Sequence, residues 1–292
     1  MNVYEIVTEK IMEQMKAGVI PWQRPWHSIS DEAISYVSRK PYSLLNQMLL
    51  GIPGEFLTRN QIKALGGNIK KGAKAQFVVF FRWVVKGTHK VLTNEEVSNT
   101  KPEDLSSLYP MLRYYYVFHL SDTEGIQTKI KEDEPVVKIK PVEAAEAIIR
   151  DYSERTDLCI KQVKSNRAYY SPLRDEVVVP LLDQFDNSEQ FYATLFHECT
   201  HSTGHPKRLN RKTLTEDDGF GGKEYSREEL VAEMGAAMLC NRLALDTKKV
   251  FKNSVAYLQN WLSALKNDQS MIVWAASRSE KAVKFVLNEV SE

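Results

Sequence analysis

Phe196-His197-Glu198-Cys199-Thr200-His201-Ser202-Thr203-Gly204 is the stretch that decides how this 292-residue chain is interpreted. The residues around it predict a helix over about 188–203, capped by Asn187 or Ser188 and ended by Gly204 and Pro206. His197 and His201 are four residues apart, so both imidazoles leave one face of that helix and can reach a single cation. Glu198 stands where the H-E-x-x-H metallohydrolases carry their general base. The pattern predicts one Zn²⁺ per chain, with His197 and His201 as ligands and Glu198 as the catalytic residue.

A third protein ligand is needed, because a catalytic zinc site has three protein ligands and one open position. A second helix, expected over about 226–243, offers Glu228, Glu229 and Glu233. We expect Glu229 to be the ligand and Glu233, one turn later, to support a ligand histidine, and the opposite assignment remains open. His205 is another alternative that can line the cleft, although it follows Gly204 too closely for the longer three-histidine pattern. The simpler interpretation is that these histidines and glutamates are solvated groups on helix surfaces.

Such a site predicts hydrolysis of an amide bond, with the metal polarising the carbonyl and Glu198 carrying the proton to the leaving amine. Tyr225 and His205 are the candidates for stabilising the oxyanion.

The first half of the chain is strongly basic, although the whole chain has a net charge of only +1. Residues 36–90 include ten Lys and Arg residues and one acidic residue, Glu55, so the net charge of this stretch is 10 − 1 = +9. Aromatic residues occur beside them, including the run Tyr114-Tyr115-Tyr116, and this combination is typical of proteins that bind single-stranded nucleic acid. No groove-reading motif is present, so the binding is expected to be independent of sequence. The residues predicted to bind are Trp22, Arg24, Trp26, Tyr42, Lys70, Lys71 and Lys74.

Two alternatives compete with that prediction. The basic region is also suited to an acidic protein partner, and tryptophans near prolines are often core residues. A basic domain beside a metal site is also consistent with a nuclease, but nucleases usually gather carboxylates around Mg²⁺ or paired metals.

The expected fold class is α+β, in two domains. Helices are predicted over 3–17, 43–50, 59–65 and 142–155, and strands over 76–86 and 112–120. A hairpin of 168–171 and 176–179 precedes the histidine helix, and two amphipathic helices end the chain. Residues 128–141 are rich in charge and hold two prolines, as linkers do, so the domains are placed at 1–135 (mixed α/β) and 142–292.

The cysteine pattern and the N-terminus predict a cytoplasmic protein. Cys159, Cys199 and Cys240 lie too far apart for a disulfide framework, and Cys199 is expected to be buried and to face away from the metal. The N-terminus has no signal-peptide pattern. The most apolar run, 77–85, is far shorter than the ~20 residues of a membrane span, so no membrane partner is expected.

Several motifs together resemble the ArdC-type antirestriction proteins of plasmids. They are Pro21-Trp22-Gln23-Arg24-Pro25-Trp26, Asn68-Ile69-Lys70-Lys71-Gly72, Tyr170-Ser171-Pro172, the histidine motif and Arg227-Glu228-Glu229-Leu230-Val231-Ala232-Glu233. The resemblance spans nearly the whole chain. It implies an N-terminal single-stranded-DNA-binding domain joined to a zincin-like metallopeptidase domain.

The implied role is to protect incoming DNA from host restriction during conjugative transfer. A host protein is the candidate substrate of the peptidase domain. The alternative is a protein that coats single-stranded DNA and whose metal site is structural.

Overall fold

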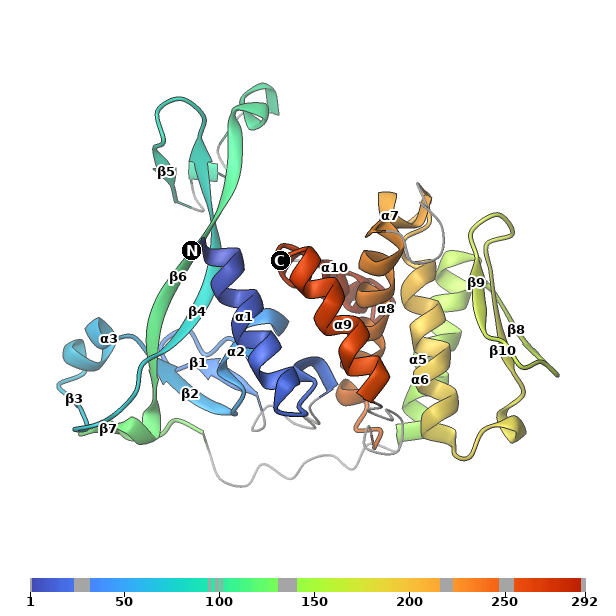
Figure 1. Cartoon of the computed structure of the whole chain (residues 1–292), viewed down its shortest axis with the longest axis horizontal. Coiled ribbons are helices and arrows are strands. Elements are labelled where there is room, and N and C mark those ends of the chain that lie inside the picture. The colour runs from blue at the N-terminus through green and yellow to red at the C-terminus, as the bar shows by residue number, and fades with distance from the viewer. Residues whose placement is uncertain are drawn as a thin grey trace.

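A twisted five-stranded sheet forms the centre of the first half of the chain (Figure 1). The computed structural model describes residues 2–23, 32–93, 96–97, 100, 102–130, 141–215, 223–246 and 255–289. In sheet order the strands are β1 (Ala33–Ser35), β2 (Gly54–Leu57), β6 (Leu108–His119), β4 (Gln76–Val85) and β5 (Val91–Leu92). β1 and β2 are parallel, and the other neighbours are antiparallel. A separate pair, β3 (Asn68–Ile69) and β7 (Thr123–Glu124), lies beside α3 (Arg59–Ala64).

The longest pairing joins β4 to β6 and forms a ribbon that rises out of the body of the molecule (Figure 1). Its register runs from Gln76 opposite Val117 to Val85 opposite Leu108. β6 begins four residues before the predicted strand, in spite of Pro110. Proline is tolerated on edge strands, and in the described chain β2 pairs only with the far end of β6, at Phe118 and His119.

The second half packs helices against a three-stranded sheet in the order β8-β10-β9. β8 runs parallel to β10, and β9 and β10 form the predicted hairpin. The elements predicted for this half are present, and the structure adds β8 and α7, which were not predicted. Their bounds are α5 (Pro141–Thr156), β8 (Cys159–Val163), β9 (Tyr169–Ser171), β10 (Glu176–Pro180), α6 (Ser188–Ser202), α7 (Lys212–Thr215), α8 (Lys223–Arg242), α9 (Val255–Asn267) and α10 (Met271–Val286).

The two halves share one hydrophobic core. Apolar side chains of α1 (Val3–Lys16) and α2 (Leu44–Leu50) pack with those of α8, α9 and α10. Figure 1 shows α1 and α9 side by side between the two sheets. α8, the helix of the second half that carries the acidic residues, therefore also contacts the N-terminal elements. No helix in the described ranges is both long enough and apolar enough to cross a membrane.

Trp22 belongs to this shared core, so the prediction that it binds nucleic acid is wrong. It lies in a short 3-10 turn, Pro21–Gln23, is only 1% exposed and meets Trp261 edge to face, with 6.3 Å between ring centroids. The alternative interpretation, that a tryptophan near prolines is a core residue, holds for Trp22. The other two predicted residues of this segment, Arg24 and Trp26, lie outside the described residues, as do 131–140, where the domain boundary is predicted.

We expect Trp22→Ala to lower the free energy of unfolding by about 3–5 kcal/mol, because a buried tryptophan leaves a cavity and loses its transfer free energy. Trp83→Ala removes the same side chain from a site that is 39% exposed and should cost about 1 kcal/mol or less. Urea denaturation of both variants measures the difference. An equal loss of unfolding free energy in the two variants would mean that packing Trp22 between the two halves does not stabilise the chain.

Candidate metal centre

The close contact between α6 and α8 places side chains from both helices at one point. α6 begins at the cap Asn187, whose side chain accepts a hydrogen bond from the Gln190 N–H at 2.9 Å. Where the helices meet, a Cβ added at Gly235 would lie 2.5 Å from Cγ2 of Thr200. Only glycine at position 235 allows this approach, since real Cβ contacts are not that short.

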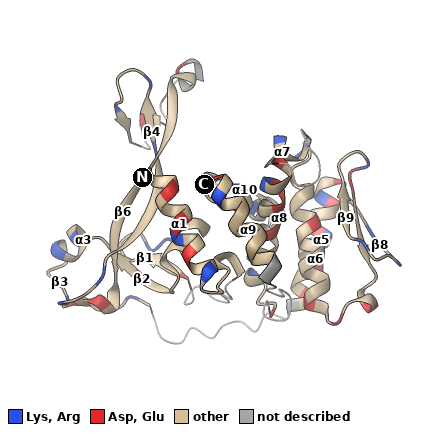
Figure 2. Cartoon of the chain, viewed as in Figure 1, with Lys and Arg blue, Asp and Glu red and all other residues tan. Residues whose placement is uncertain are grey.

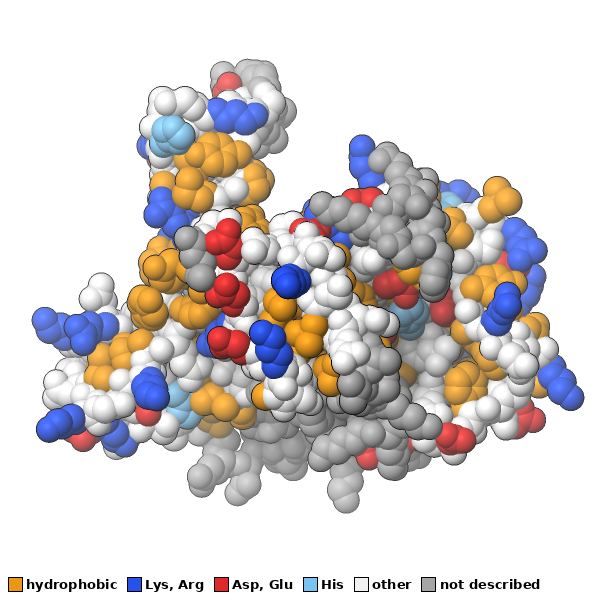
Figure 3. Space-filling view, in the orientation of Figure 1, with side chains coloured by type: hydrophobic (Ala, Val, Ile, Leu, Met, Phe, Trp, Pro, Cys, Tyr) orange, Lys and Arg blue, Asp and Glu red, His pale blue; other side chains and the backbone are white. Residues whose placement is uncertain are grey.

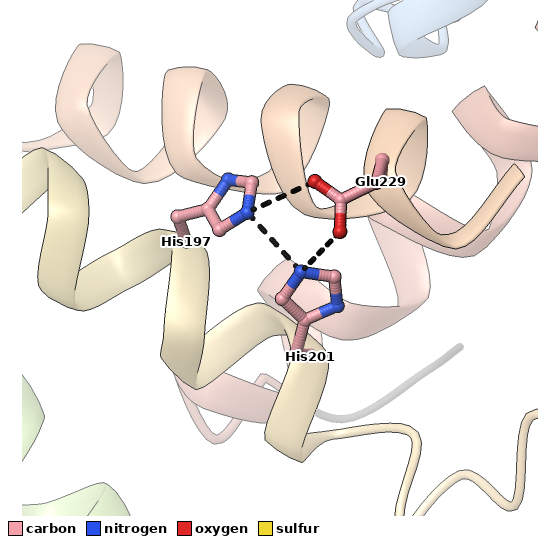
Figure 4. Close-up of side chains that lie close together, drawn as sticks. All are labelled: His197, His201 and Glu229. Carbon is pink, nitrogen blue, oxygen red and sulfur yellow. Dashed lines mark hydrogen bonds and ion pairs between the residues drawn. The ribbon is translucent and has the colours of Figure 1, made fainter. Parts of the chain in front are cut away.

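His197 and His201 from α6 and Glu229 from α8 converge on one point (Figure 4). The two Nε2 atoms are 3.1 Å apart, and the Glu229 carboxylate lies 3.6 Å from His197 Nε2 and 3.4 Å from His201 Nε2. The donor atoms all lie within 4.8 Å of one another. Two imidazoles and a carboxylate at this spacing fit a divalent cation such as zinc, with one position open.

Glu228 holds His201 from the side opposite the metal position. Its Oε1 lies 3.3 Å from His201 Nδ1, and its Oε2 accepts hydrogen bonds from Arg211 Nε at 3.0 Å and Thr213 Oγ1 at 2.6 Å. Burial disfavours the charged form of Glu228, but His201 and Arg211 outweigh it and lower its pKa to about 2. A fixed carboxylate at Nδ1 orients the ring so that Nε2 faces the cation.

The sequence assigned this supporting role to Glu233, whose hydrogen bond in the structure is to Tyr257 and not to a ligand histidine. Glu233 accepts a hydrogen bond from the Tyr257 hydroxyl at 3.0 Å, and burial raises the pKa of its carboxyl group. Among the described residues Glu233 is not in the group of converging ligands, and neither is His205. His205 Nδ1 accepts a hydrogen bond from the Lys207 N–H at 3.2 Å and lies 3.8 Å from Asp175.

Glu198 is buried beside the first ligand histidine, with 8% of its surface exposed. Its carboxylate has no hydrogen-bond partner within the ranges that the structure describes, so it is available to a water molecule or substrate. Cys199 is buried in the core on another side of the helix, as predicted, and burial raises the pKa of its thiol.

Sequence reasoning missed Tyr257 and Gln23, which connect the N-terminal segment to α8, the helix that carries Glu229. The Gln23 amide lies 3.4 Å from the Tyr257 hydroxyl, which donates to Glu233 on α8. Residues 23 and 257 are 234 positions apart, and no local pattern marks their pairing.

Fold and donor set together define a zincin-like metal centre attached to a second, sheet-containing domain. The family model "Zincin-like metallopeptidase" matches residues 143–278, and the model "N-terminal domain of anti-restriction factor ArdC" matches residues 1–118. The metal-free crystal structure of the antirestriction protein ArdC from plasmid R388 is similar over 99% of this chain and 98% of its own, at 30% identity and a TM-score of 0.70. This chain belongs to the ArdC antirestriction family.

Further matches also cover nearly the whole chain. The Mn(II)-bound structure of the R388 protein is 29% identical with a TM-score of 0.71. DNA primase TraC of Escherichia coli is 28% identical over 97% of this chain, but the chain spans only 20% of that protein. Protein y4eC of Sinorhizobium fredii is 28% identical over all of this chain and 93% of its own length. The zincin-like domain implies a bound metal, and the R388 protein is described with Mn(II).

We expect Glu229→Gln to weaken metal binding by more than the about 10- to 100-fold that is typical of a group outside the coordination shell. Glu233→Gln leaves the converging atoms in place and should stay within or below that range. Titration calorimetry with Zn²⁺ at fixed pH measures both, and thermal melting checks the fold. A larger loss for Glu233→Gln would make Glu233 the third ligand.

Proposed function

We propose that this protein is a zinc-dependent peptidase that acts while its N-terminal domain is bound to single-stranded DNA. The observation that carries the proposal is the convergence of His197, His201 and Glu229 beside the carboxylate of Glu198, which makes no hydrogen bond to the described residues. Two imidazoles and one carboxylate suit zinc better than Mn²⁺, which prefers oxygen ligands. The role that follows is protection of incoming DNA from restriction during transfer.

Each residue of the site has its own role in amide hydrolysis. A divalent cation held there supplies Lewis acidity toward the carbonyl and the attacking water. His197, His201 and Glu229 would hold the cation, and Glu228 and Arg211 keep the His201 ring from turning. Glu198 takes a proton from the attacking water at its carboxylate oxygen and returns it to the departing amine.

We propose that the protein works in the cytoplasm. Its three cysteines are free in the structure, two of them buried, and small buried thiols of this kind persist in a reducing compartment.

We expect Glu198→Gln to lower peptide cleavage about 10²–10⁴-fold, because it removes the general base and keeps the side-chain shape. Casein, with and without a single-stranded oligonucleotide, is the assay substrate, and elemental analysis checks that the metal remains. Wild-type protection of DNA by the metal-loaded variant would exclude proteolysis as the mechanism. It would favour the second candidate function, a protein that coats single-stranded DNA. Its metal site would then only hold α6 and α8 together.

Nucleic-acid binding is the other half of the proposal, and exposed lysines support it. Lys70, Lys71 and Lys74 surround the turn at Gly72, whose φ of +86° favours glycine. Figure 2 shows Lys and Arg around α3 and β3, where this turn lies. Tyr42 suits the role less, because its ring packs edge-on against Phe56 and burial raises the pKa of its hydroxyl to about 12.

Reversal of Lys70, Lys71 and Lys74 to Glu should weaken binding to a thymidine oligonucleotide. It should also reduce the slope of log affinity against log salt by about 2, since each contact with a single strand contributes about 0.7. The control reverses three exposed lysines of the second half, Lys164, Lys281 and Lys284. An unchanged slope in the first variant, or an equal change in both variants, would show that Lys70, Lys71 and Lys74 do not contact the DNA.

A further inference from the structure

One face of the β4–β6 ribbon combines exposed aromatic rings with arginines. Residues opposite one another in an antiparallel pair point to the same side of the sheet. The register places Val78 opposite Tyr115, Phe80 opposite Arg113 and Arg82 opposite Met111. We call the surface made by Phe80, Arg82, Arg113 and Tyr115 the Tyr115 face.

The rings on the Tyr115 face form a flat platform. Phe80 and Tyr115 are stacked, with centroids 4.2 Å apart and planes inclined by 10°. The Arg82 guanidinium lies 5.0 Å from the centroid of the Phe80 ring. Tyr115 keeps 48% of its surface exposed, so the platform is open to a further flat ring.

The charge of the same face is positive. An open groove of about 480 Å³ is lined by residues of β4, β5 and β6. Its lining is Arg82, Val91, Leu92, Thr93, Arg113, Tyr114 and Tyr115, and among these described residues none is acidic. In Figure 3 the arm formed by β4, β5 and β6 carries hydrophobic side chains next to Lys and Arg. Rings flanked by guanidinium groups suit a strand of unstacked bases and phosphates.

The opposite face of the ribbon is covered by α1 at only part of its length. There Phe77 is opposite Tyr116, and Phe77 packs into the core that includes α1. α1 carries the exposed carboxylates of Glu9 and Glu13. α1 also places Lys10 Nζ 4.8 Å from the centroid of the Phe77 ring, so its charge does not decide between the two faces. The described strand residues that share this face with Tyr116 include no basic side chain, whereas Arg82 and Arg113 lie on the Tyr115 face.

We propose that the Tyr115 face is a binding surface for single-stranded DNA. An unpaired base stacks on Tyr115, and Arg82 and Arg113 bind the adjacent phosphates. This inference rests on the proposed nucleic-acid binding by the first half of the chain, and it moves the stacking contact away from Trp22 and Tyr42. A duplex is excluded from the stacking contact because its bases are already stacked.

Tyr115→Ala and Tyr116→Ala form a matched pair, because the two neighbouring residues are 48% and 57% exposed on opposite faces. We expect Tyr115→Ala to weaken binding of a fluorescein-labelled 15-residue thymidine oligonucleotide about tenfold, the effect of losing one stacked base. Tyr115→Phe should bind like the wild type, and Tyr116→Ala should lie within about twofold of it. Anisotropy titrations measure the affinities, and melting temperatures check the fold.

The arginines are tested separately by salt dependence. Replacing Arg82 and Arg113 together by Gln should reduce the slope of log affinity against log salt by about 1.4, for two contacts. Wild-type affinity in Tyr115→Ala, or an equal loss in Tyr116→Ala, would overturn the inference while leaving DNA binding intact. Failure of the wild-type chain to bind the oligonucleotide would instead overturn the proposed function.

Discussion

The contact between α6 and α8 at Thr200 and Gly235 is the constraint on which the rest of the structure depends. Histidines on α6 alone offer two donors, and the third arrives only because α8 lies close enough for Glu229 to reach them. The same approach places Glu228 behind the His201 ring. Metal binding would in turn hold the two helices together, so the site and the packing reinforce each other.

α8 also connects the two halves of the chain. One side of it carries Glu229 toward the histidines, while Leu230, Val231 and Met234 enter the core shared with α1 and α2. The contact from Gln23 through the Tyr257 hydroxyl to Glu233 adds a polar link to this core. The N-terminal segment is therefore in contact with the helix that carries Glu229.

The ribbon that bears the Tyr115 face stands apart from the metal centre, and both belong to one chain with a common core (Figure 1). Binding along a DNA strand would hold the metal centre near whatever proteins occupy that strand. Tethering of this kind raises the effective concentration of one site at another without a new contact between them. It offers a way for a site of modest intrinsic specificity to act only where single-stranded DNA is present.

The sequence by itself determined the histidine pair, the acid beside it and most helices, because helical spacing and capping are local properties. It also named Glu229 as the preferred third donor, which the structure brings to the histidines. The tertiary structure alone decided that Trp22 is buried, that Glu228 and not Glu233 supports His201, and that Tyr115 shares its face of the ribbon with Phe80 and Arg82. Those outcomes depend on the rotation of a helix about its axis, on strand register and on contacts between distant residues, and no local pattern encodes them.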